Sequence, residues 1–180
     1  AGCAVPTAGR TALGRKGRRV SLRWDQGRGT IEAMLGSGAL EQVPASREHA
    51  DLLLAHARQH LASARVIAAT DPEGGYAMVY DAARKALSAV LANQGLRTTS
   101  LRGHHQAAYD AVLTQLDPPM GRDLRPFLRL KQARGSAEYP KRDELPLAPD
   151  DVLEDCVKAG RIVDICTKVL DAMPVFVPGS

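Results

Sequence analysis

The chain has 180 residues, of which 44% are hydrophobic and 24% are charged. These are the proportions of an ordinary globular domain, so global disorder, a collagen-like repeat and a disulfide-dense scaffold are excluded. Only seven residues are aromatic, whereas alanine and leucine abound, and this favours close-packed helices over sheets. No window of 18 consecutive apolar residues occurs, so we predict no membrane-spanning helix.

The formal net charge of +4 is concentrated near the N-terminus, where residues 1–28 hold seven Lys or Arg residues against the single acidic residue Asp25. Residues 1–19 lack hydrophobic periodicity and are rich in Gly, Ala and Arg. They contain no apolar run of the length that a signal peptide needs. We therefore expect 1–28 to be a disordered basic tail, with a nucleic-acid-binding arm as the alternative.

A short helical strap is predicted at 29–45, in which Thr30 caps a helix that Gly36 ends. The first long helix is predicted over 46–70, with an apolar stripe that the sequence repeats every three or four residues. That stripe consists of Ala50, Leu53, Ala57, Leu61 and Ala64. Asp71 and Pro72 are typical of a helix start, so a second helix is predicted over 72–93, ended by Gly95.

A polar linker is predicted at 96–102, followed by helices over 103–116 and 122–137. The buried residues expected of the latter helix include Phe127 and Leu128. Residues 140–149 contain three prolines, and a last helix is predicted from a cap at Asp150 to residue 173. Helices joined by short loops favour an all-α, up-and-down bundle of four or five helices over 46–174, with a C-terminal tail at 175–180.

Cysteine and histidine spacing gives no strong sign of a metal or disulfide. Cys156 and Cys166 lie ten residues apart on one predicted helix, about 15 Å, which is too far for a disulfide. We expect both thiols to be reduced core groups, which fits a cytoplasmic location. His56 and His60 have a spacing that can chelate a metal, but no further ligand is marked. No metal and no cofactor are therefore predicted.

The strongest candidate site is the basic stretch 122–142. Arg122, Arg125 and Arg129 form a stripe along the predicted helix, and Arg134 and Tyr139 stand at its end, before a proline. Such a stripe can hold phosphate while an aromatic ring stacks on a base. The alternative is a solvated basic face with a tyrosine that packs on the bundle.

On the preceding long helix, Asp81 is spaced to pair with Arg84 and Lys85. This pattern is typical of a surface ion-pair cluster, and the helical wheel places Asp81 away from the buried stripe. If Asp81 has a function, we expect it at an interface. His104 and His105 open the helix over 103–116, where they can contact a phosphate or simply occupy a helix terminus.

The helix GGYAMVYDAARKALSAV, a further helix and the segment RLKQARGSAEYP together resemble the HEPN (higher eukaryotes and prokaryotes nucleotide-binding) domain family. The resemblance covers about 46–173. It is nearest to bacterial stand-alone members with an Arg-x-x-Ala-acidic-Tyr motif, here Arg134, Ala137, Glu138 and Tyr139. It implies a helical bundle that forms a homodimer with a basic cleft acting on or binding RNA or nucleotides.

In ribonuclease members of that family, which are often toxins paired with a nucleotidyltransferase, an Arg-x(4–6)-His motif cleaves RNA without a metal. By position, Arg134 matches the motif arginine and Tyr139 its histidine. Tyrosine is a poor base near neutral pH, so catalysis would require an activated Tyr139 or a histidine such as His104 or His105.

The resemblance thus implies either a toxin-like ribonuclease with Arg134 and Tyr139 catalytic, or a non-catalytic binding module that partners a nucleotidyltransferase or another protein. In both cases Arg84, Asp81, Arg125, Arg129 and His104 are the expected RNA- or nucleotide-binding residues. A third reading is a helical protein whose basic tail is its nucleic-acid contact.

Overall fold

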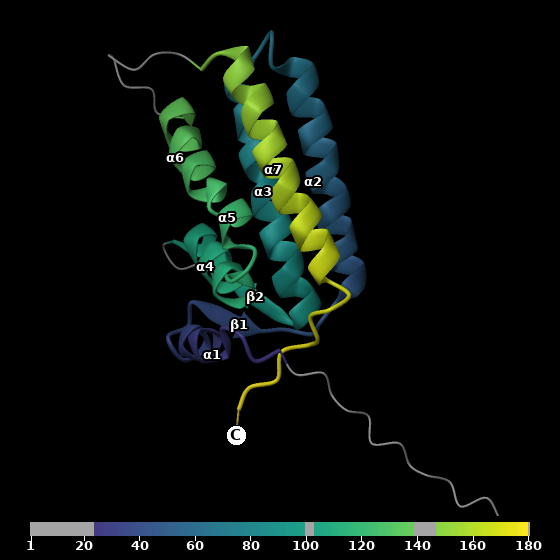
Figure 1. Cartoon of the computed structure of the whole chain (residues 1–180), viewed down its shortest axis with the longest axis vertical. Helices are drawn as coiled ribbons and strands as arrows, with labels where there is room; N and C mark the ends of the chain where they lie inside the picture. The colour runs from purple at the N-terminus through teal and green to yellow at the C-terminus, as the bar shows by residue number, and fades with distance from the viewer. Residues whose placement is uncertain (1–23, 100–102, 139–146, 180) are drawn as a thin grey trace, which may run out of the picture.

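The computed structural model describes residues 24–99, 103–138 and 147–179. Its described part is a helical bundle with one small two-stranded sheet, so the predicted all-α fold class is confirmed (Figure 1). The predicted basic tail at 1–28 lies almost entirely outside the described residues. Its last residues are described: the Trp24 indole N–H donates to the Gln115 carbonyl oxygen at 3.1 Å, and Arg28 is the first residue of a helix.

Three long helices form the body of the bundle: α2 (Arg47–Ile67), α3 (Pro72–Gln94) and α7 (Pro149–Val169), which lie side by side in Figure 1. Their contact faces are rich in small residues, as the sequence predicts. A Cβ atom on Gly75 of α3 would lie 3.2 Å from the Val152 side chain and 3.4 Å from the Ala64 carbonyl oxygen. The three helices therefore approach closely at this end. On α2 the predicted stripe is buried except at one position, where Leu54 is buried and the predicted Leu53 is only half-buried.

The ends of α3 form as the sequence predicts. The Asp71 carboxylate accepts a hydrogen bond from the Gly74 N–H at 2.8 Å, and Pro72 is the first helical residue. Gly95 ends the helix with φ of +76°, in the left-handed region that favours glycine. The start of α7 differs from the prediction, because its cap is Ala148 rather than Asp150. There the Asp151 carboxylate accepts the Ala148 N–H at 3.1 Å.

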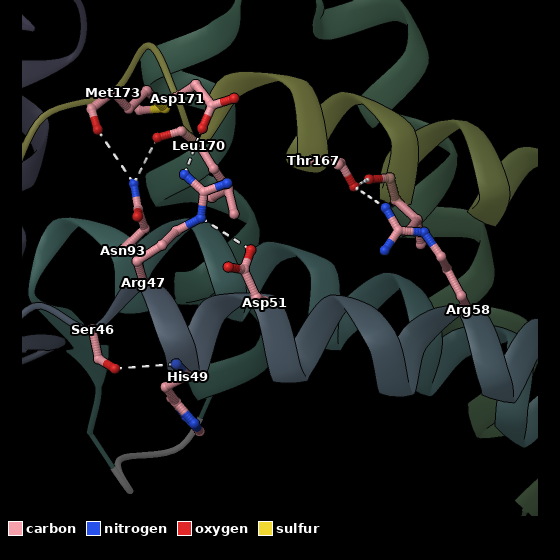
Figure 2. Close-up of polar contacts among 11 residues, drawn as sticks. Ser46, Arg47, His49, Asp51, Arg58, Asn93, Thr167, Leu170, Asp171 and Met173 are labelled. Atoms are coloured by element: carbon pink, nitrogen blue, oxygen red, sulfur yellow. Dashed lines mark hydrogen bonds and ion pairs between the residues drawn. The ribbon is translucent and has the colours of Figure 1, made fainter.

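Polar contacts hold the C-terminal end of α7 against α2 and α3 (Figure 2). Arg47, in the first turn of α2, contacts the Asp171 carboxylate at 2.5 Å. The Asn93 amide of α3 donates to the carbonyl oxygens of Leu170 and Met173 at 3.0 and 3.3 Å. These bonds satisfy carbonyl groups that the end of a helix would otherwise leave without partners.

The two strands contradict the predicted linker at 96–102. Strand β1 (Leu40–Gln42) pairs antiparallel with β2 (Leu96–Thr98), with Leu40 opposite Thr98. Leu40 and Leu96 are both buried, so tertiary packing stabilises a pairing that three-residue segments would not form alone. The predicted strap at 29–45 thus consists of α1 (Arg28–Gly36) and β1.

The helix predicted over 122–137 is divided in two, which corrects the prediction of one continuous basic stripe. A short α5 (Gly121–Leu124) is followed by α6 (Pro126–Glu138), and the division falls at Arg125 and Pro126. Proline lacks an N–H and clashes with the preceding turn, so it starts a helix rather than continuing one. Phe127 is buried as predicted, but Leu128 is 44% exposed and is not a core residue.

The remaining helix, α4 (His104–Leu116), packs beside α3 and below α5 (Figure 1). The C-terminal segment, predicted only as a tail, also packs on this end of the molecule. Phe176 is buried, its N–H donates to the Gln94 carbonyl at 2.9 Å, and the Arg28 guanidinium lies 5.3 Å from its ring. This segment therefore extends the core beyond α7.

Candidate functional site

A pocket of about 500 Å³ lies on the face of α3 that is bordered by α2, α4 and α6. Its walls come from these four helices, which the bundle brings together from distant parts of the sequence. The pocket is lined by His60, Gly74, Ala77, Met78, Tyr80, Asp81, Arg84, His105 and Arg134. Small residues on the first half of α3 leave this space open between the larger polar side chains.

Arg134, near the C-terminal end of α6, stacks on an aromatic ring at the pocket. Its guanidinium carbon lies 5.1 Å from the centroid of the Tyr80 ring, within cation–π range. The Tyr80 hydroxyl lies 2.7 Å from His105 Nδ1, and its ring stacks on Phe127 with 5.6 Å between centroids. Tyr80 is therefore fixed from two sides and supports Arg134. Burial raises the pKa of Tyr80, which keeps its hydroxyl protonated.

Asp81 forms an ion-pair cluster with the cations that follow it on α3. Arg84 Nε donates to Asp81 Oδ1 at 2.9 Å, and Lys85 Nζ contacts Oδ2 of the same carboxylate. Burial alone would raise the pKa of Asp81, but the hydrogen bonds from Lys85 and Arg84 outweigh it and the pKa is lowered. Asp81 is thus an ionised, half-buried group, and its predicted pairing with Arg84 and Lys85 is confirmed.

His60 reaches the same carboxylate from α2. Its Nδ1 atom lies 3.1 Å from Asp81 Oδ2, which is within ion-pair distance, but the pair does not meet the geometry of a hydrogen bond. Burial and the positive charge of Lys85 lower the pKa of His60, in spite of the attraction of Asp81. The imidazole is therefore neutral near pH 7 and holds a nitrogen that can accept a proton.

Of the residues predicted from the sequence, the pocket gathers Arg134, Arg84 and Asp81. Arg125 and Arg129 do not line it. The first pairs with Asp117 at 3.0 Å, and the second lies 3.5 Å from a buried carboxylate. His104 begins α4, next to the pocket residue His105, and Tyr139 lies outside the described residues.

The buried carboxylate beside Arg129 is Asp155 of α7, which is 1% exposed. It accepts a hydrogen bond from the Tyr76 hydroxyl at 2.7 Å and another from Lys158 Nζ at 2.8 Å. Arg129 therefore joins Tyr76 and Lys158 around the buried carboxylate of Asp155. The packing of α6 against α7 explains its position. It need not bind a ligand.

Sequence reasoning missed His60 and Tyr80 as pocket residues. Tyr80 is only 2% exposed, yet its hydroxyl and ring face other pocket groups. The sequence names His105 together with His104 as a phosphate contact, and of the two His105 lines the pocket. The sequence singles out His60 only by its spacing to His56, and that spacing gives no sign of the contact with Asp81 that the fold creates.

Within the part of the chain that the structure describes, no group of three or more His, Cys, Asp or Glu side chains is arranged to hold a metal ion. In the same residues, no helix combines the length and apolar character needed to cross a membrane. Neither a protein-family model, nor a curated protein, nor a solved structure shows significant similarity to the chain. The site is therefore interpreted from its own geometry.

The pocket combines a positive balance of charge with the neutral imidazole of His60. Arg84 and Arg134 line the pocket with one carboxylate, Asp81, and Lys85 contacts that carboxylate from outside the lining. A guanidinium presents several N–H donors in a planar fork that matches the oxygens of a phosphate. The arrangement can thus bind a phosphate group and present imidazole nitrogens beside it.

Proposed function

We propose that the chain binds RNA or a nucleotide through this pocket, with Arg134 and Arg84 contacting a phosphate group. The observation that carries the proposal is the position of Arg134 on the Tyr80 ring, which fixes a guanidinium at a pocket with a second arginine. Preorganised cations lose little conformational freedom when they bind, and phosphate contacts supply most of the affinity of proteins for nucleic acids.

The resemblance to the HEPN family supports the same reading, since its motif arginine corresponds to Arg134. A homodimer, toxin-like behaviour and a nucleotidyltransferase partner belong to the proposal as expectations from that resemblance. Light scattering of the purified protein tests the dimer, for which a mass of about twice 19.3 kDa is expected. Overexpression that arrests growth, and that Arg134→Ala relieves, tests the toxin-like behaviour.

Metal-independent RNA cleavage is the catalytic form of this proposal, and the histidines favour it. In that reaction a ribose 2′-oxygen attacks the adjacent phosphorus, a base takes the 2′-OH proton, and the 5′-oxygen of the next nucleotide leaves with a proton from an acid. His60 is neutral near pH 7 and is suited to the base role. His105 lies against Tyr80 on the other side of the pocket and is the candidate acid.

Binding of a fluorescently labelled single-stranded RNA, followed by anisotropy, tests the proposal. Arg134→Lys keeps the positive charge, but an ammonium group cannot make the two parallel hydrogen bonds of a guanidinium. The Kd for RNA should therefore rise about tenfold, the scale of one charge-assisted contact. Arg122→Gln is the matched control, because Arg122 is an exposed arginine of α5 that does not line the pocket. Its Kd should stay within about threefold of wild type, the scale of one general phosphate contact.

Cleavage is measured separately, by incubating the RNA with wild type or His60→Gln protein in the presence of EDTA. Cleavage that resists EDTA and falls about a hundredfold in His60→Gln supports the catalytic form. If wild-type protein binds RNA without cleaving it, the chain is a binding module. Equal Kd values for wild type and Arg134→Lys would contradict the proposed site.

A further inference from the structure

A second cavity, of about 360 Å³, lies further along α3, where the start of α2 and the two-stranded sheet meet the helix. Its apolar lining includes the half-buried Leu53 together with Leu91 and Leu96, whose side chains are only 2% and 1% exposed. Val43, Pro44 and Ala92 complete this wall. The cavity is large enough for a small organic ligand and has the apolar lining that such sites usually show.

The charged groups of this cavity are all cations. Arg84, Lys85 and Arg97 line it, and no Asp or Glu is among the described residues of its wall. The carboxylates that pair with these cations, Asp81 and Glu41, lie outside the lining. The polar edge of the cavity is therefore positively charged, and no carboxylate among its described lining residues neutralises that charge.

Two further polar groups lie at the α2 side of the cavity. Ser46 caps α2 by accepting the His49 N–H at 3.1 Å, and the His49 ring lies on the side of α2 opposite the contact between Arg47 and α7 (Figure 2). The cavity has no Phe, Tyr or Trp among the described residues that line it. A flat base would thus find no aromatic ring to stack on, whereas an alkyl chain is suited to the leucine wall.

We propose that this cavity binds an organic anion with an aliphatic body, such as a medium-chain carboxylate. The alkyl chain lies on Leu53, Val43 and Pro44, next to the buried Leu91 and Leu96, and the carboxylate accepts hydrogen bonds from Lys85 and Arg84. In the unliganded protein these two cations contact Asp81, so a bound carboxylate shares them with Asp81. The proposal stands on this cavity alone and does not require the chain to bind RNA.

Arg84 lines both this cavity and the pocket that contains Arg134. One guanidinium cannot give its full set of hydrogen bonds to two anions at once. A carboxylate in the second cavity should therefore weaken phosphate binding in the first, and the weakening is reciprocal. This shared arginine gives the second site a means of regulating the first.

The test uses octanoate as the probe, with octyltrimethylammonium as a probe that has the same alkyl chain and the opposite charge. Methyl resonances of the full chain are followed by NMR during each titration. Octanoate should cause saturable shifts of the Leu91 and Leu96 methyl groups with a Kd of about 1 mM or below, as expected for a ligand of its size. The cationic probe should cause no saturable shifts there.

Two variants locate the site. Lys85→Met removes the charge at similar length and should raise the octanoate Kd about tenfold, whereas Lys168→Met, on the exposed face of α7, should leave it unchanged. Ser88→Phe places a ring in the cavity and should abolish binding while circular dichroism shows an intact fold. Should Ser88→Phe not fold, Lys85→Met alone decides the result. Equal affinity for both probes, shifts outside the cavity, or an unchanged Kd in Lys85→Met would overturn the proposal.

Discussion

The hydrogen bond between Tyr76 and Asp155 lends itself to a quantitative prediction about stability. Tyr76 is 0% exposed, and its hydroxyl donates to Asp155 Oδ2 at 2.7 Å. Tyr76→Phe leaves this oxygen with Arg129 at 3.5 Å, while Lys158 remains on Oδ1. A hydrogen bond to a buried charged group contributes about 1.5–3 kcal/mol, and the loss of this one leaves Asp155 Oδ2 without a hydrogen-bond donor among the described residues.

We expect Tyr76→Phe to lower the free energy of unfolding by about 2 kcal/mol. For a chain of this size that corresponds to a fall in Tm of about 4–8 °C. Urea unfolding followed by circular dichroism measures the free energy, and a thermal melt measures Tm. The denaturant dependence should stay unchanged, since the substitution alters one contact and not the surface that unfolding exposes.

Tyr109→Phe is the matched control for this change. Tyr109 is also buried, and its ring stacks on Phe127 with 5.3 Å between centroids, but its hydroxyl has no hydrogen-bond partner among the described residues. Removing an unpaired buried hydroxyl should leave stability unchanged or increase it by about 1 kcal/mol. If both variants lose the same stability, the loss comes from the change of ring and the argument about Asp155 is refuted.

Three further predictions concern His60, the end of α3 and the buried thiols. Because the folded protein lowers the pKa of His60 below its unfolded value of about 6.5, the unfolded state binds the proton more readily and folding loses stability as the pH falls below that value. His60→Gln should therefore lose less unfolding free energy than wild type between about pH 7.5 and about pH 5.5, and an equal loss would contradict the assignment. Gly95→Ala should destabilise by about 1–3 kcal/mol in urea unfolding, because φ is +76° and the added Cβ would lie 2.9 Å from the Val43 carbonyl oxygen. In a Cys3→Ser background, Cys156 and Cys166 should not react with a thiol reagent until the protein unfolds, since burial raises the pKa of both thiols, that of Cys166 to about 12. Fast reaction of the native protein would show that the helix α7 is less well packed than described.

The features that could be predicted from the sequence are those with a local cause. Asp71, Pro72 and Gly95 act on the backbone within a few residues, so their pattern alone determines where α3 begins and ends. The apolar repeat of α2 likewise follows from helical periodicity, with an error of one residue at Leu53 and Leu54. The break at Pro126 also has a local cause, and it divides the arginine spacing that by itself predicts one stripe.

The features that could not be predicted depend on contacts between distant segments. The strands at 40–42 and 96–98 are too short for an alternating pattern and form because Leu40 and Leu96 are buried together. The pocket depends on how α2 and α4 pack around α3, which places His60 and His105 beside Asp81 and Tyr80. Spacing along one helix carries no information about such neighbours.

The central claim is that Arg84 and Arg134 act together on one phosphate, and a double-mutant cycle in RNA binding tests it most directly. Arg84→Gln and Arg134→Gln should each raise the Kd about tenfold, with the helical circular dichroism spectrum preserved. If both arginines hold the same phosphate, the double variant should bind only slightly more weakly than either single variant, because the second substitution removes a contact that the first has already disrupted. Two single variants that bind RNA as wild type does would contradict the account.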